Sequence, residues 1–264
     1  MASNGVRPAL GVWTALVLVA LYAPIVVMAV FSFNAGQQVV VWKGFTLDWY
    51  RKALANADAR EAFLDTMTIA LGSTLIATVL GTCAAVAGVR LSFPGKRAFN
   101  LIASLPISVP DVLMGFSLFV FFLILGAGFG HWTVIVAHAT FSMAYVAVVV
   151  SARLQAVDAS LELAAQDLGA TPFRAFLRVT LPAIAPAVAA GALLAFTLSL
   201  DDVVITYFTT SPRVTTLPVY LYSRVRFQFT PEVNALSTMM LAASVLLVVA
   251  ARKLHRPSLT GDGK

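Results

Sequence analysis

Six long stretches of apolar residues alternate with short polar segments along the chain. Each stretch is long enough to form an α-helix that crosses a bilayer, which takes about 20 predominantly apolar residues. We expect these spans at about 10–33, 66–89, 99–125, 131–151, 183–200 and 233–251. The pattern predicts an all-α integral membrane protein with six transmembrane helices, in which 1–264 form a single transmembrane domain.

The third apolar stretch is interrupted in its middle. Pro106, Pro110 and Asp111 lie within it. Proline cannot donate a helical hydrogen bond, and a carboxylate in the middle of a span costs on the order of 2.5–3.5 kcal/mol on insertion scales. We therefore expect a broken helix. At the break Asp111 caps the freed N–H groups, faces a water-filled path, or does both.

The segment 153–182, between the fourth and fifth stretches, is polar overall but has apolar positions at helical spacing. Leu161, Ala164, Ala165 and Leu168 form one stripe of a first short helix. Gly169 is suited to a left-handed stop, and Thr171 followed by Pro172 is typical of a new helix start. The second helix has its own apolar edge at Phe173, Phe176 and Leu177. This predicts a water-facing elbow that docks on a partner outside the membrane.

Composition supports the membrane assignment and excludes several functions. The chain is 59% hydrophobic and 11% charged, whereas soluble domains carry about 25% charged residues. The net charge is +6, but the basic residues lie at the ends of apolar stretches and form no nucleic-acid surface. The single cysteine, Cys83, lies inside an apolar stretch, so neither a disulfide framework nor a metal site is expected. No phosphate-binding loop or nucleophile–base pair is present, so no enzymatic activity is expected.

Charge at the ends of the stretches predicts the orientation. More lysines and arginines flank the stretches on the side of the two termini than on the other side. The positive-inside rule then places both termini, and the elbow with them, in the cytoplasm.

Two adjacent carboxylates, Asp201 and Asp202, follow the fifth stretch. No lysine or arginine occurs between Arg178 and Arg213 to neutralise them locally. The pair is either an interfacial stop for the helix or an acidic group that attracts a cationic substrate.

The elbow resembles the cytoplasmic coupling loop of permease subunits of ATP-binding-cassette (ABC) importers. The family pattern is Glu-Ala-Ala, three residues, Gly, nine residues and Ile-x-Leu-Pro. The chain matches it at Ala164, Ala165, Gly169, Leu181 and Pro182, with Val179 in the isoleucine place. Leu163 stands where the pattern has glutamate. Glu162, one residue earlier, projects about 100° away on a helix, so it takes no role from the motif.

This resemblance implies a type I ABC importer permease-like fold with a coupling-helix elbow. It also implies residues that couple the chain to an ATPase, namely Ala164, Ala165, Gly169, Phe173, Phe176 and Pro182.

Further stretches look like permeases of the spermidine/putrescine family, closest to the putrescine-type subunit. They are 31–34, 41–50, 109–115, 144–148, 195–202, 215–218 and 231–235. The resemblance implies a polyamine substrate, which is a di- or tri-cation and fits the acidic residues. As a hypothesis, Asp111, Asp201 and Asp202 line the path of this cation. The resemblance also implies a multi-pass protein of the bacterial inner membrane.

The same resemblance implies the partners. They are ATPase subunits that bind ATP and Mg, a second homologous permease, and a periplasmic polyamine-binding protein that docks on the outer loops at 44–57 and 207–232. No cofactor is expected in this chain, and membrane lipid surrounds it.

Three alternatives remain open from the residues. The first is an importer of the same class that carries another solute. The second is a gradient-driven secondary transporter in which Asp111 relays a proton or cation. The third is an intramembrane enzyme, although the scattered aspartates and histidines lack the spacing of a catalytic pair.

Overall fold

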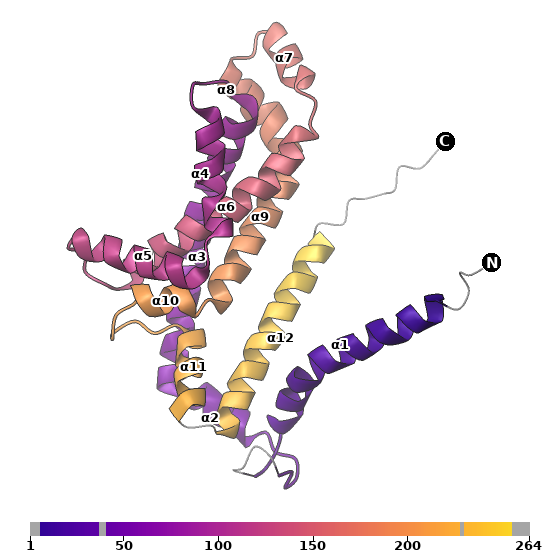
Figure 1. Ribbon diagram of the computed structural model, residues 1–264, viewed down its shortest axis with the longest axis vertical. Helices are drawn as coiled ribbons and strands as arrows, with labels where there is room; N and C mark the ends of the chain where they lie inside the picture. Colours follow the sequence, from indigo (N-terminus) through magenta and orange to yellow (C-terminus); the bar gives the residue numbers. More distant parts are fainter. Residues whose placement is uncertain (1–5, 37–40, 228–229, 255–264) are drawn as a thin grey trace. The chain divides into compact units, whose positions relative to one another are not determined.

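The computed structural model describes residues 6–36, 41–227 and 230–254, and these residues form a helical protein (Figure 1). An isolated bridge between Asn34 and Phe45 is the extended pairing within these ranges. The elements are α1 (Val6–Phe31), α2 (Asp48–Ala55), α3 (Ala57–Arg90), α4 (Lys96–Ser108), α5 (Asp111–Ile124), α6 (His131–Gln155), α7 (Ser160–Asp167), α8 (Pro172–Ala175), the π-helical turn η1 (Phe176–Thr180), α9 (Leu181–Asp201), α10 (Val204–Thr209), α11 (Leu217–Phe227) and α12 (Pro231–Leu254).

The predicted fold class is confirmed. Five described helical stretches are long and apolar enough to cross a membrane, and there are six if α4 and α5 count as one broken span. The five are Leu10–Phe31, Ala57–Arg90, His131–Gln155, Pro172–Asp201 and Pro231–Val249.

The predicted interruption of the third stretch is present as a sharp bend. Helices α4 and α5 meet at 111°. Val109 between them is extended, with φ −88° and ψ 129°, because a residue before proline avoids the helical region. Pro106 is accommodated inside α4, so the break arises at Pro110 alone.

The described residues form two compact units. One comprises residues 6–36, 41–60, 221–227 and 230–248, and the other comprises Glu61–Tyr220 with residues 249–254.

In the first unit, a polar cluster joins the segment 32–36, directly after α1, to residues 41–50. The buried Asn34 side chain donates from Nδ2 to the Val41 carbonyl (2.7 Å) and accepts at Oδ1 from the Lys43 N–H (2.8 Å). Trp49 Nε1 donates to the Asn34 carbonyl (2.8 Å), and Tyr50 bonds the Ser32 hydroxyl (2.6 Å). The two aromatic residues of α2 thus fix α2 to this segment.

In the second unit, α3, α6 and α9 share a core that includes Val146, Val150 and Ile184. Gly81 of α3 is required for this packing. A Cβ there would lie 2.6 Å from the Met143 carbonyl oxygen and 2.7 Å from Val146 Cβ. Small residues let helices approach closely where lipid provides no hydrophobic driving force between them.

The elbow continues into the fifth span without interruption, which corrects the expectation of a separate second short helix. Helix α8, η1 and α9 form one helical run from Pro172 to Asp201. Pro182 lacks an N–H and would collide with the carbonyl four residues earlier in an ordinary helix. The chain adapts by widening one turn, in which the Leu181 N–H bonds the Phe176 carbonyl five residues back.

Candidate functional site

The turn between α7 and α8 has the geometry that the sequence predicts. Gly169 has φ +92°, in the left-handed region, which a residue with a Cβ rarely adopts. A Cβ at Gly169 would meet no atom within 4 Å, so glycine is favoured here by the backbone conformation and not by lack of space. Thr171 caps α8, because its hydroxyl accepts from the Arg174 N–H at 3.4 Å.

Apolar side chains of the elbow are exposed rather than packed. The elbow surface, defined here as Leu161, Leu163, Leu168 and Phe173, reaches 91% exposure at Leu168 and 70% at Phe173. Helix α7 has no buried residue. Exposed apolar side chains on an otherwise polar segment are typical of a surface that a partner covers.

The other predicted coupling residues lie on the same elbow. Ala164 and Pro182 are exposed, whereas Ala165 and Phe176 are half-buried. The structure therefore brings the predicted set together on α7, α8, η1 and the start of α9. The role of this set in coupling stays a prediction.

Two predicted path residues, Asp111 and Asp201, are exposed. Asp111 is the first residue of α5, and its carboxylate forms no hydrogen bond or ion pair with another described residue; the cap of α5 has no side-chain hydrogen bond. Asp201 is the last residue of α9. The sequence left two roles open for Asp111, capping the broken helix and facing a water-filled path. The capping contact is absent from the described residues, and the path role stays a prediction.

Helix α5 packs directly on α10, which begins two residues after Asp202. A Cβ on Gly115 would lie 2.8 Å from Phe208 Cδ2 and 3.2 Å from Ile205 Cα. The N-terminal half of α5, which begins at Asp111, therefore lies beside α10, the helix that follows Asp201 and Asp202.

Asp202 differs from its neighbour because its carboxylate is engaged. Oδ2 accepts from the Thr206 N–H (2.7 Å) and the Thr206 hydroxyl (2.9 Å), and lies 3.3 Å from His138 Nε2. These contacts cap α10 and hold it to α6. The path role of Asp202 stays a prediction, and its contacts are those of an anchor.

His138, which is fully buried, is the centre of this polar network. Its Nδ1 lies 2.7 Å from the Ser199 hydroxyl, its Nε2 lies 2.9 Å from the Thr206 hydroxyl, and Ser73 of α3 bonds Ser199 at 3.0 Å. We call Ser73, His138, Ser199, Asp202 and Thr206 the His138 network. Sequence reasoning missed it because the partners are far apart along the chain and no local pattern joins them.

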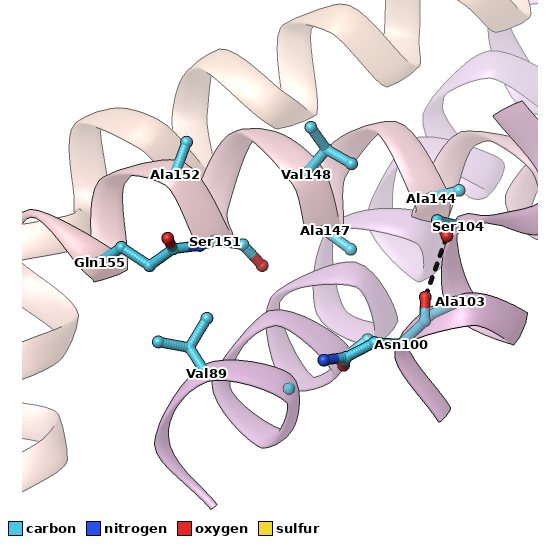
Figure 2. A pocket seen from close by; sticks show the side chains of 12 residues that line it. Val89, Asn100, Ala103, Ser104, Ala144, Ala147, Val148, Ser151, Ala152 and Gln155 are labelled. Atoms are coloured by element: carbon cyan, nitrogen blue, oxygen red, sulfur yellow. Dashed lines mark hydrogen bonds between the residues drawn. The ribbon is translucent and has the colours of Figure 1, made fainter. Parts of the chain in front are cut away.

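A cavity of about 560 Å³ lies between α3, α4 and α6 (Figure 2). Its polar lining consists of Asn100 and Ser104 of α4 and Ser151 and Gln155 of α6, and the rest is apolar. A cation that leaves water needs a paired charge, and no lining residue carries one. This cavity therefore offers no counter-charge to a cation, whereas the end of α9 has two carboxylates, Asp201 and Asp202. Among the described residues no group of His, Cys, Asp and Glu side chains could hold a metal ion.

A multi-span helical protein with an exposed elbow and unpaired carboxylates has the features of a membrane transport subunit. Residues 77–259 match the family of binding-protein-dependent transport system inner membrane components, and the chain belongs to this family. The family resemblance is confirmed, and with it the expectation of a transport component rather than an enzyme. The chain is a multi-pass membrane protein.

Two curated relatives are similar over most of the chain. The putrescine transport system permease protein PotI of Escherichia coli (strain K12) is 45% identical over 230 residues, covering 84% of this chain and 82% of that protein. The spermidine/putrescine transport system permease protein PotC of Escherichia coli (strain K12) is 39% identical over 242 residues, covering 92% of each.

A solved structure has the same fold. It is a bacterial ABC transporter involved in the import of the acidic polysaccharide alginate, with a TM-score of 0.73 over 97% of this chain and 99% of that chain. The sequence identity is 16%, so this likeness concerns the fold alone.

Proposed function

We propose that the chain is a membrane-spanning permease subunit of an ATP-driven importer that carries polyamines, putrescine or spermidine, across the bacterial inner membrane. The observation that carries the proposal is the 45% identity to a putrescine permease protein over 84% of the chain. The relative named for spermidine and putrescine, at 39%, supports the same substrate class.

The proposed assembly contains a second homologous permease, ATPase subunits that bind ATP and Mg, and a periplasmic polyamine-binding protein on the outer loops. This chain needs no cofactor of its own. A structure of the alginate transporter in complex with a substrate-bound periplasmic protein supports this kind of partner. Both termini and the elbow face the cytoplasm, as the distribution of basic residues favours.

The elbow is the proposed ATPase contact. Leu168 and Phe173 expose apolar area on a segment outside the membrane, and covering such area drives association at about 25 cal/mol per Å². Ala164, Ala165, Gly169, Phe176 and Pro182 shape the same elbow. Helices α8, η1 and α9 form one helical run, so the second half of the elbow and Asp201 belong to the same run of the chain.

The acidic end of α9 is the proposed cation site. Asp111 and Asp201 are exposed and have no basic partner among the described residues, as a site for a di- or tri-cation requires. Asp202 contributes negative charge to this part of the path and positions α10 through its bonds to Thr206.

The test is co-purification followed by reconstitution in proteoliposomes. The proposal expects ATPase, permease and binding-protein partners, and ATP hydrolysis stimulated by putrescine or spermidine together with the binding protein. If another solute stimulated ATP hydrolysis and the polyamines did not, the proposed substrate would be wrong. Uptake by this chain without an ATPase would establish the gradient-driven alternative instead.

A further inference from the structure

A side-chain hydrogen bond joins the first turn of α7 to the end of η1. The Thr180 hydroxyl donates to Glu162 Oε2 at 2.7 Å, a length typical of a hydroxyl bound to a carboxylate. Thr180 is 1% exposed and Glu162 is half-buried. The bond is therefore sheltered from water, although the elbow around it is largely exposed.

The covalent route from α7 to α9 contains two weak points. One is the turn at Gly169, where a single left-handed residue reverses the chain. The other is η1, where the bond from Leu181 N–H to the Phe176 carbonyl replaces the ordinary ladder. Wide turns of this kind are uncommon and frequent at functional sites. A load on α7 that followed the backbone would be absorbed by bending at these two points.

The Glu162–Thr180 bond bypasses both points. It connects α7 to Thr180, the residue immediately before α9, and α7 also packs against α8 and η1. In Figure 1, α7 and α8 lie together at one end of the α6–α9 pair. Glu162 turns inward to make the bond, while Leu163 remains 60% exposed on the elbow surface.

We propose that Glu162 and Thr180 form a clasp that makes α7 and α9 move as one body, so that Glu162 is a positioning residue for the coupling of ATP hydrolysis to transport. The proposal rests on the proposed function of the chain. It assigns to Glu162 a role inside the elbow, distinct from direct contact with the ATPase.

The test measures how many ATP molecules are hydrolysed per putrescine imported, in the complete complex reconstituted in proteoliposomes. Thr180→Val removes the donor at nearly constant volume, and Glu162→Met removes the acceptor. Each variant should raise this ratio about three- to tenfold, within the range over which mutations alter coupling between sites. Glu162→Gln keeps an acceptor oxygen and should behave as the wild type.

Two further variants separate a clasp from a general loss of stability. Thr238→Val is a matched control, because the Thr238 hydroxyl bonds the Asn234 carbonyl within its own helix, α12. The double variant Glu162→Met/Thr180→Val should be no worse than either single variant, because both remove the same bond. An unchanged ratio in Thr180→Val, or additive effects in the double variant, would overturn the clasp.

Amide hydrogen exchange in the full chain tests the clasp independently of the proposed function. Thr180→Val should accelerate exchange in α7 relative to Thr238→Val, and equal exchange would contradict the proposal. If the wild-type complex imports no polyamine, the proposed function fails while the exchange result still decides the clasp.

Discussion

The two ends of α9 depart from the usual distribution of side chains in opposite ways. At the elbow end, apolar residues such as Leu168 and Phe173 are exposed on a polar segment. At the acidic end, polar residues such as His138, Ser199 and Thr206 are buried and bonded to one another. The elbow surface leaves apolar side chains exposed, whereas the polar groups of the His138 network bond one another within the chain.

Exposure and pairing distinguish the candidate binding residues from residues that hold the fold. Asp201 and Asp202 are adjacent, yet Asp201 is exposed and Asp202 bonds Thr206 and His138. A role in the path therefore follows from the unpaired carboxylate more directly than from the paired one. The same reasoning distinguishes Leu163, which is exposed on the elbow surface, from Glu162, which is half-buried and bonded to Thr180.

The largest effect is expected from His138→Leu, which removes the central residue of the His138 network at the acidic end of α9. His138→Leu leaves the buried Ser199 hydroxyl and the Asp202 carboxylate each with one hydrogen-bond partner fewer, and an unsatisfied buried polar group costs about 1–3 kcal/mol, more when it is charged. Thermal unfolding of the purified complex should show a clear loss of stability. His131→Leu is the control, because His131 also contacts a carboxylate, that of Asp65, but its side chain is 44% exposed. Equal losses in the two variants would contradict the account.

Gly169→Val should have the next largest effect, at the elbow end. A β-branched residue with φ +92° is strained by about 1–2 kcal/mol or more, and the turn must change to relieve it. ATP-dependent uptake should fall at least about tenfold while the membrane-embedded part stays folded. Gly169→Asn should retain most of the uptake, because asparagine tolerates the left-handed region. Normal uptake by Gly169→Val would rule out a role for this turn.

Leu168→Ser tests the elbow surface without strain in the backbone. The side chain is 91% exposed, so the stability of the isolated chain should not change. Burial of a leucine is worth about 1.5–3 kcal/mol, and affinity for the ATPase should fall about tenfold or more. Leu54→Ser, on α2 and 67% exposed, should leave this affinity unchanged. Affinity that survives Leu168→Ser would place the ATPase elsewhere.

The smallest effect sharpens the difference between the two aspartates. Asp201→Asn, and likewise Asp111→Asn, should lower kcat/KM for polyamine uptake about fivefold, which corresponds to about 1 kcal/mol of lost attraction. Neither should change thermal stability. Asp202→Asn should lower stability, because it weakens the bonds to α10 and His138. The reverse assignment of the two effects would overturn the distinction between binding and anchoring.

The spans and the elbow could be predicted because their signals are local. Apolar length marks each span, and the sequence from Gly169 to Pro172 contains a helix stop followed directly by a helix start. The break at Pro110 has an equally local cause. The continuity of α8 with α9 could not be predicted, because it depends on one widened turn that accommodates Pro182.

The His138 network could not be predicted from the sequence for a different reason. His138 and Asp202 meet only because α6 and α9 pack side by side, and no spacing along the chain encodes that pairing. The Glu162–Thr180 bond is similar, since it needs the elbow to be folded before the two residues approach. Exposed positions were easier to anticipate than paired ones.

Accessibility of the elbow surface tests the central claim most directly. Leu168→Cys is introduced with Cys83→Ser, because Cys83 is exposed, and a membrane-impermeant maleimide is applied to either face of sealed vesicles. The account predicts labelling from the cytoplasmic face when the ATPase is absent, and protection when it is bound. Labelling from the periplasmic face, or equal labelling with and without the ATPase, would contradict it.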